Sequence, residues 1–93
     1  LSALLLLEGV AESARANAQR HGVTLVVTAD ADLPPIAGDR LQLETVLHNL
    51  VTNAVDALHN QRGPRTVRLV ATRAAADTVR VSVADNGPGV AAE

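Results

Sequence analysis

Residues 39–60 of the chain read DRLQLETVLHNLVTNAVDALHN, with apolar residues three and four positions apart. This spacing predicts one amphipathic helix, which Asp39 would cap at its N-terminus and which would end near Asn60. The side predicted to be buried consists of Leu43, Val46, Leu47, Leu50, Ala54 and Leu58.

The opposite side of this helix is polar but largely uncharged. At roughly 100° per residue, one narrow line, which we call the asparagine stripe, contains Gln42, Thr45, Asn49, Asn53, Asp56 and Asn60. A face that only meets water usually carries Lys, Glu and Arg, so amides one turn apart suit the binding of a ligand or a metal. Polar residues are also common on solvated helix faces, and the stripe alone leaves both interpretations open.

Length and composition exclude several classes of protein. The 93 residues make one small domain or a piece of a larger one, and the latter is expected because the chain begins at Leu1 and stops just after a glycine-rich loop. With no cysteine there are no disulfides or thiolate metal sites. A net charge of −2, scattered basic residues and no aromatics predict no nucleic-acid binding. No apolar run approaches the roughly 18 residues of a membrane span, and no signal peptide is visible.

The remaining segments predict an α+β two-layer sandwich. A helix is expected over residues 3–21, with Gly22 as its left-handed stop and with one inward side. That side consists of Leu4, Leu7, Val10, Ala11, Ala14 and Ala18. Alternating β-branched residues predict a strand over 23–29 and a hairpin over 66–84, whose loop is residues 74–77. This order of elements predicts helices on one face of a mixed sheet.

A second informative feature follows the last expected strand. Residues 85–89 read Asp-Asn-Gly-Pro-Gly. A carboxylate at a strand end can face a ligand, and the glycines after it allow the backbone to come close. Asn-Gly and Pro-Gly also form ordinary turns, so this segment by itself fits either a ligand-binding loop or a simple turn.

Together and in this order, the two features resemble the N box and the first glycine box of sensor histidine kinases. The matching residues are Asn49, Asn53, Ala54, Asp56 and Ala57 on the helix, then Asp85, Gly87 and Gly89 in the loop. The resemblance covers essentially the whole chain and implies the Bergerat-type (GHKL) ATP-binding fold that these kinases share with DNA gyrase. Residues 1–93 would be a partial ATP-binding domain, incomplete at its C-terminus because the family's ATP lid and second glycine box come later.

The resemblance implies ATP and Mg²⁺ as cofactors. Asn53 looks like the amide whose oxygen ligates Mg²⁺, a hard cation that prefers oxygen ligands. Asn49, one turn earlier, would contact phosphate or metal-bound water and is the expected catalytic residue. Asp56 would lie near the nucleotide. Asp85 would accept a hydrogen bond from the adenine amino group. Gly87 and Gly89 would let the loop close on the base.

Position 49 also separates branches of this superfamily. Its water-activating ATPases carry a glutamate there as a general base, whereas an amide cannot take a proton from water. Glu44 is no substitute, because it lies well round the helix from the stripe. Asn49 therefore favours phosphoryl transfer over hydrolysis.

The implied function is that of the ATP-binding part of a two-component sensor histidine kinase. The γ-phosphoryl group would pass to a histidine in a dimerisation domain upstream of Leu1, and then to a response regulator. His21, His48 and His59 lack the sequence context of an acceptor and are expected to be solvated or capping residues. The parent is expected to be a homodimer with this domain in the cytoplasm, and an inner-membrane sensor is one form it can take. The piece alone is expected to be inactive, with exposed sheet edge and apolar surface that favour self-association or domain swapping.

Three alternatives remain open. The fold also serves GHKL ATPases, which Asn49 disfavours, and serine kinases, which it does not. It could also act as a non-catalytic nucleotide-binding or dimerisation module, which the retained Asn53 and Asp85 disfavour. Within the kinases, the Asn-Ala-x-Asp-Ala ending resembles nitrogen-regulation and dicarboxylate sensors.

Overall fold

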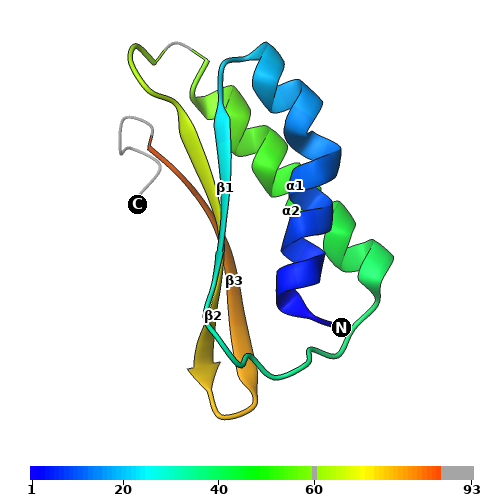
Figure 1. The fold of residues 1–93 in the computed structure, drawn as a ribbon. Coiled ribbons are helices and arrows are strands. Elements are labelled where there is room, and N and C mark those ends of the chain that lie inside the picture. Colours follow the sequence, from blue (N-terminus) through cyan, green and yellow to red (C-terminus); the bar gives the residue numbers. More distant parts are fainter. Residues whose placement is uncertain (60, 87–93) are drawn as a thin grey trace.

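The computed structural model describes residues 1–59 and 61–86, and it has two layers, with both helices on one face of the sheet (Figure 1). The elements are α1 (Ala3–Arg20), β1 (Thr24–Ala29), α2 (Arg40–Ala57), β2 (Thr66–Ala75) and β3 (Thr78–Asp85). The predicted α+β sandwich is confirmed. Within the described residues, neither helix is long and apolar enough to cross a membrane.

The sheet is mixed, as predicted, in the order β1-β2-β3. β1 lies parallel to β2, and β3 returns antiparallel to β2. The register pairs Val67, which is completely buried, with Asp85 at the end of β3. Because side chains alternate along a strand, Asp85 is on the helix-covered side with Val83 and Val81.

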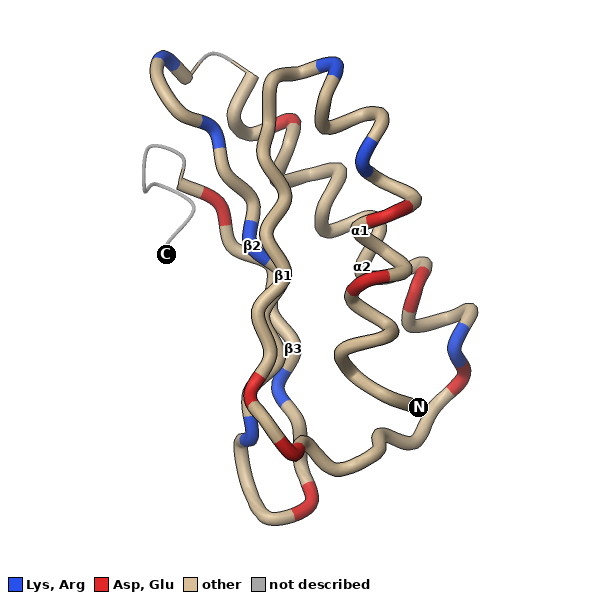
Figure 2. Tube along the Cα trace, in the orientation of Figure 1, with Lys and Arg blue, Asp and Glu red and all other residues tan. Residues whose placement is uncertain are grey.

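The core between the layers is entirely aliphatic, as a chain without aromatic residues requires. Its largest fully buried side chains are Leu6, Leu7, Leu58, Leu69, Val10, Val51, Val55 and Val67. Among the described residues no polar or charged side chain is buried. Polar chemistry is therefore confined to the surface of the two layers and to their ends. Figure 2 shows the basic and acidic residues scattered along both helices and the sheet.

The start of α2 is the predicted one, but its end is not. The Asp39 carboxylate accepts a hydrogen bond of 3.0 Å from the backbone N–H of Gln42, which caps the helix. The helix ends at Ala57 rather than near Asn60, which lies outside the described residues. The backbone N–H of Leu58 donates to the carbonyl of Val55, three residues back, so the last turn tightens and the helix stops.

The buried side of α2 is rotated toward α1 relative to the predicted one, since Val51 and Val55, which were not predicted to face inward, are each only 1% exposed. Leu47 and Ala54 are buried as predicted, but Val46 is 57% exposed and Leu50 is 45% exposed. At roughly 100° per residue, these two lie on the flank opposite to the one that meets α1. Neither α1 nor the described part of the sheet covers that flank, so the predicted apolar face was placed too far from α1.

Smaller corrections concern α1, β1 and the hairpin. Leu6 is buried in α1, whereas Leu4, predicted to be inward, is 42% exposed. α1 ends at Arg20 rather than residue 21, and Gly22 has the predicted left-handed conformation with φ of +66°. β1 begins at Thr24 rather than residue 23. β2 continues to Ala75, so the expected loop of residues 74–77 is shorter, and β3 runs one position further, to Asp85.

Candidate functional site

The asparagine stripe lies on the exposed side of α2. Asn49, Asn53 and Asp56 are all exposed. Within residues 1–59 and 61–86, the side-chain amides of Asn49 and Asn53 make no hydrogen bond. Thr45, further toward the N-terminus, differs because its hydroxyl donates to the backbone carbonyl of Leu41 at 2.8 Å. The two asparagines therefore keep their polar atoms available to a ligand.

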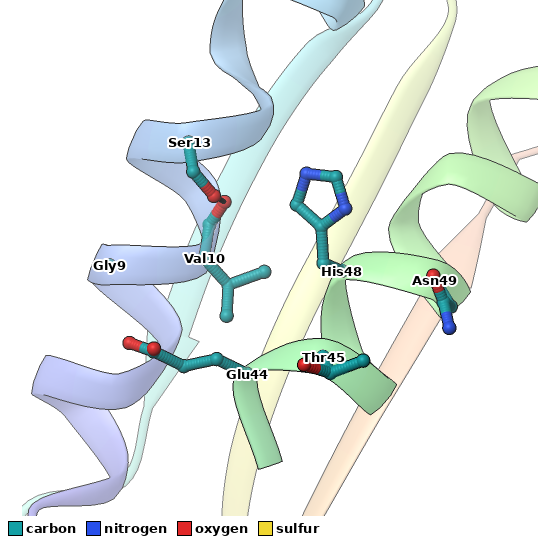
Figure 3. A pocket seen from close by; sticks show the side chains of 7 residues that line it. All are labelled: Gly9, Val10, Ser13, Glu44, Thr45, His48 and Asn49. Atoms are coloured by element: carbon teal, nitrogen blue, oxygen red, sulfur yellow. Dashed lines mark hydrogen bonds between the residues drawn. The ribbon is translucent and has the colours of Figure 1, made fainter. Parts of the chain in front are cut away.

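A hollow of about 320 Å³ lies between α1 and α2. Its lining residues are Gly9, Val10, Ser13, Glu44, Thr45, His48 and Asn49 (Figure 3). The Glu44 side chain extends toward α1 and that of His48 lies between the helices, whereas the Asn49 side chain turns away from α1. The Glu44 carboxylate is thus directed away from the asparagine stripe, as predicted.

Asp85 lies at the end of β3. It is half-buried and lines a small hollow of about 130 Å³ together with Thr66, Arg68, Ala84 and Asn86. β3 ends at the same end of the molecule as the C-terminus of α2 (Figure 1). The fold therefore brings Asp85 and the C-terminal part of the stripe to one end of the two layers. Asn49 and Asp85 line separate hollows, and Gly87 and Gly89 lie outside the described residues.

The donor set limits what kind of metal could bind here. Among the described residues, no group of three or more His, Cys, Asp or Glu side chains could hold an ion. At the stripe, the amide oxygens of Asn49 and Asn53 could hold a metal whose remaining ligands come from water or from a bound anion. That combination fits Mg²⁺ arriving with a phosphate, because Mg²⁺ binds oxygen and keeps several waters.

The three histidines have separate surroundings. His21 Nδ1 lies 2.9 Å from the carbonyl oxygen of Asn17, so the ring caps the end of α1. His48 is half-buried in the hollow between the helices, and His59 is exposed just after α2.

A hydrogen-bond network at this end was not foreseen from the sequence. The Arg65 guanidinium donates to the carbonyls of Gln61 (3.0 Å), His21 (2.9 Å) and His59 (3.3 Å). Asn86, next to Asp85, is bonded to the same loop. No periodicity or motif marks such contacts, because their partners are irregular backbone groups, and His21 is 44 positions away from Arg65.

Comparison with known proteins assigns the family. A family model described as "Histidine kinase-, DNA gyrase B-, and HSP90-like ATPase" matches residues 38–93. The chain belongs to this family. Its match begins just before the Asp39 cap of α2 and includes the stripe and Asp85, so the resemblance drawn from these residues is confirmed.

Relatives within the family are bacterial sensor kinases. The C4-dicarboxylate transport sensor protein DctS of Rhodobacter capsulatus is 38% identical over 98 residues, which cover 97% of this chain and 14% of that protein. The sensory histidine kinase/phosphatase NtrB of Klebsiella oxytoca is 40% identical over 78 residues, covering 73% of this chain and 22% of that protein. The chain thus corresponds to a small part of the length of these relatives.

A solved structure supports the fold independently. The catalytic domain of histidine kinase ThkA superposes with a TM-score of 0.79 at 24% identity, over 95% of this chain and 55% of that domain. The two layers described here therefore correspond to about half of a known kinase catalytic domain. The chain is a part of a histidine kinase ATP-binding domain.

Proposed function

We propose that this chain is the ATP-binding part of a sensor histidine kinase that transfers the γ-phosphoryl group of ATP to a histidine outside these 93 residues. The observation that carries the proposal is a pair of amides, those of Asn49 and Asn53, that make no hydrogen bond to any described residue. They lie on a stripe that leads to the end of the molecule holding Asp85. A nucleotide lying along that line would meet polar groups at both its phosphate end and its base end.

At the base end, Asp85 would recognise adenine. An ionised carboxylate accepts hydrogen bonds but cannot donate them. It therefore matches the amino group of adenine and not the carbonyl group that guanine carries at the corresponding position. The neighbouring Val83 and Val81 are aliphatic and partly buried on the same side of the sheet. With no aromatic side chain in the sequence, the base would pack against aliphatic groups.

At the phosphate end, Asn53 would hold Mg²⁺ through its amide oxygen. When bound, the ion neutralises the charge that builds up on the phosphate oxygens during transfer. Asn49, one turn earlier, would orient the phosphate or a metal-bound water, and Asp56 would lie near the nucleotide. The contribution of this chain is thus binding and orientation.

The amide at position 49 favours transfer to a protein over hydrolysis. An amide at position 49 cannot remove a proton from water, and Glu44 extends toward α1. A histidine of a dimerisation domain would then be the acceptor, with a response regulator as the next partner. We place the domain on the cytoplasmic side, where ATP is available.

Binding of an ATP analogue, with and without Mg²⁺, tests the two ends of the site separately. In the natural full-length protein, Asn53→Ala should remove most of the Mg²⁺-dependent gain in affinity, and Asp85→Asn should weaken binding about 10- to 100-fold and remove the preference for adenine over guanine. These factors correspond to losing one hydrogen bond to a charged group.

The matched control is Gln19→Ala, which removes an exposed amide from α1, away from the stripe. It should leave both measurements unchanged. If Asn53→Ala keeps the full Mg²⁺ dependence, the metal assignment is wrong. Radiolabelled ATP then distinguishes the activities: acid-labile phosphohistidine supports the kinase, whereas phosphate release without it supports an ATPase of the same family.

A further inference from the structure

The side chain of Asn86 is engaged at both of its polar atoms. Its Oδ1 accepts from the backbone N–H of Thr66 at 3.0 Å and from Nε2 of Gln61 at 3.2 Å. Its Nδ2 donates to the carbonyl of Pro64 at 3.0 Å. Its own backbone N–H donates to the carbonyl of Thr66 at 3.2 Å. One exposed amide thus joins the end of β3 to the loop between α2 and β2.

That loop is in turn tied to both helices. Arg65 donates to carbonyls at the end of α1 (His21) and just after α2 (His59). The Gln61 side chain also donates to Pro64, at 2.9 Å, which closes the loop on itself. Through Arg65 and Asn86, the end of β3 is connected to the C-terminus of α2, and both lie at the same end of the molecule (Figure 1).

The consequence concerns Asp85, the residue immediately before Asn86. The ends of strands are the parts of a sheet that open most readily, because they have few partners beyond them. Among residues 1–59 and 61–86, the one further hydrogen bond of Asn86 is that of its backbone N–H, at 3.2 Å. The Asn86 amide therefore adds three hydrogen bonds that fix the residue directly after Asp85 to the loop between α2 and β2.

We propose that Asn86 is a positioning residue for nucleotide recognition: it holds the Asp85 carboxylate at a set place relative to the C-terminal end of α2. This inference rests on the proposed function. Successive residues of an extended chain point to opposite sides, so the Asn86 amide turns away from the side that Asp85 occupies and acts through it rather than on the base. An amide is required because one atom must accept and the other must donate.

The experiment measures binding of adenine and guanine nucleotide analogues to the natural full-length protein. Asn86→Ala is expected to lower the affinity for the adenine analogue about tenfold and to reduce the adenine-over-guanine preference. The reason is that the Asp85 carboxylate would no longer be held in place against the base. The ratio of affinities with and without Mg²⁺ should not change, because Asn53 is untouched. Asn86→Asp keeps the acceptor but loses the donor to Pro64, and it should retain more of the preference than Asn86→Ala.

Two further variants separate positioning from a general loss of stability. Gln61→Ala removes only part of the network and should reduce the preference less than Asn86→Ala while the protein stays folded. Arg73→Ala removes comparable bonds at the other end of the sheet, where the guanidinium donates to the carbonyls of Ala76 (2.8 Å) and Asp32 (2.7 Å). It should lower the melting temperature and leave the preference unchanged.

The outcomes distinguish this inference from the function on which it rests. If Asp85→Asn abolishes the adenine preference and both Asn86→Ala and Gln61→Ala keep it, the positioning role is wrong and the proposed function stands. If Arg73→Ala reduces the preference as much as Asn86→Ala, the effect is general destabilisation and the inference is overturned. If Asp85→Asn leaves the preference intact, the base assignment fails, and the inference fails with it.

Discussion

Single side chains at one end of the molecule have two separate tasks. Within the described part of the chain, Asn49 and Asn53 keep their amides unengaged on the exposed side of α2, which is what a ligand requires. Asn86 and Arg65 do the opposite, since their polar atoms are taken up by backbone groups. A polar side chain that is already satisfied contributes order, whereas one that is open contributes binding.

Arg65 should contribute to stability through the three carbonyls that it contacts. Arg65→Ala leaves the carbonyls of His21, Gln61 and His59 without this donor, and we expect the free energy of unfolding to fall by about 1–3 kcal/mol. Arg65→Lys should recover little, because one ammonium group cannot reproduce the planar fork of a guanidinium. Urea unfolding of the chain measures both.

Arg15→Ala is the comparison for this experiment. Arg15 is exposed, and its one ion pair with a described residue is to Glu12, at 2.9 Å, so its removal should change stability very little. If Arg15→Ala and Arg65→Ala change the free energy of unfolding equally, the hydrogen bonds of Arg65 contribute nothing specific to stability.

At the scale of the elements, the two helices are defined by their ends. Ser2 and Asp39 accept hydrogen bonds from the first turns of α1 and α2. Gly22 ends α1 in a left-handed conformation with φ of +66°. Any residue with a side chain is less stable than glycine in this conformation. Gly9, in the middle of α1, has no such role. A Cβ atom there would meet only Glu44 Oε2, at 3.4 Å.

Substituting the two glycines should therefore change stability in opposite directions. Gly9→Ala should stabilise the chain by about 0.5–1 kcal/mol, because alanine loses less conformational entropy in a helix. Gly22→Ala should destabilise it by about 1 kcal/mol, although nothing lies within 4 Å of the added methyl group. Denaturation curves of the two variants, compared with the parent chain, test both signs. A loss of stability in Gly9→Ala would mean that Glu44 cannot move aside.

At the scale of the whole molecule, the helix layer leaves part of α2 uncovered. Val46 and Leu50 are exposed on neighbouring turns of one flank, and β2 is the only partner of β3 among the described residues. An apolar flank beside an open sheet edge is a surface on which chains associate. Self-association remains a prediction for the 93-residue chain.

Leu50→Lys should weaken that association. The substitution places a charge on the exposed flank without touching the core, so the folded content should stay the same while the average mass falls at equal concentration. Sedimentation equilibrium measures the mass. Leu5→Lys on α1, where Leu5 is 58% exposed, is the matched control and should have little effect. A chain that is monomeric at every concentration tested would contradict the prediction.

Most of the fold was predictable because its elements are locally encoded. The Asp39 cap, the left-handed Gly22 and the alternation in 66–84 each depend on residues within a few positions of one another. The position of the buried side around α2 was predicted wrongly because it depends on α1 and the sheet, which are distant in the sequence. The same reason applies to Leu4 and Leu6: a helical pattern gives the direction of a side chain but not how far its neighbours reach.

The sequence by itself determined the family, the two layers, the asparagine stripe and the carboxylate at the end of the last described strand, because periodicity and motif spacing are properties of neighbouring residues. Only the tertiary structure decided which flank of α2 is covered, that Glu44 extends toward α1, and that Arg65 and Asn86 tie the strand end to the helix ends. Arg65 and His21 are 44 positions apart. Contacts of that kind arise from how the layers pack, and no local pattern in the sequence records them.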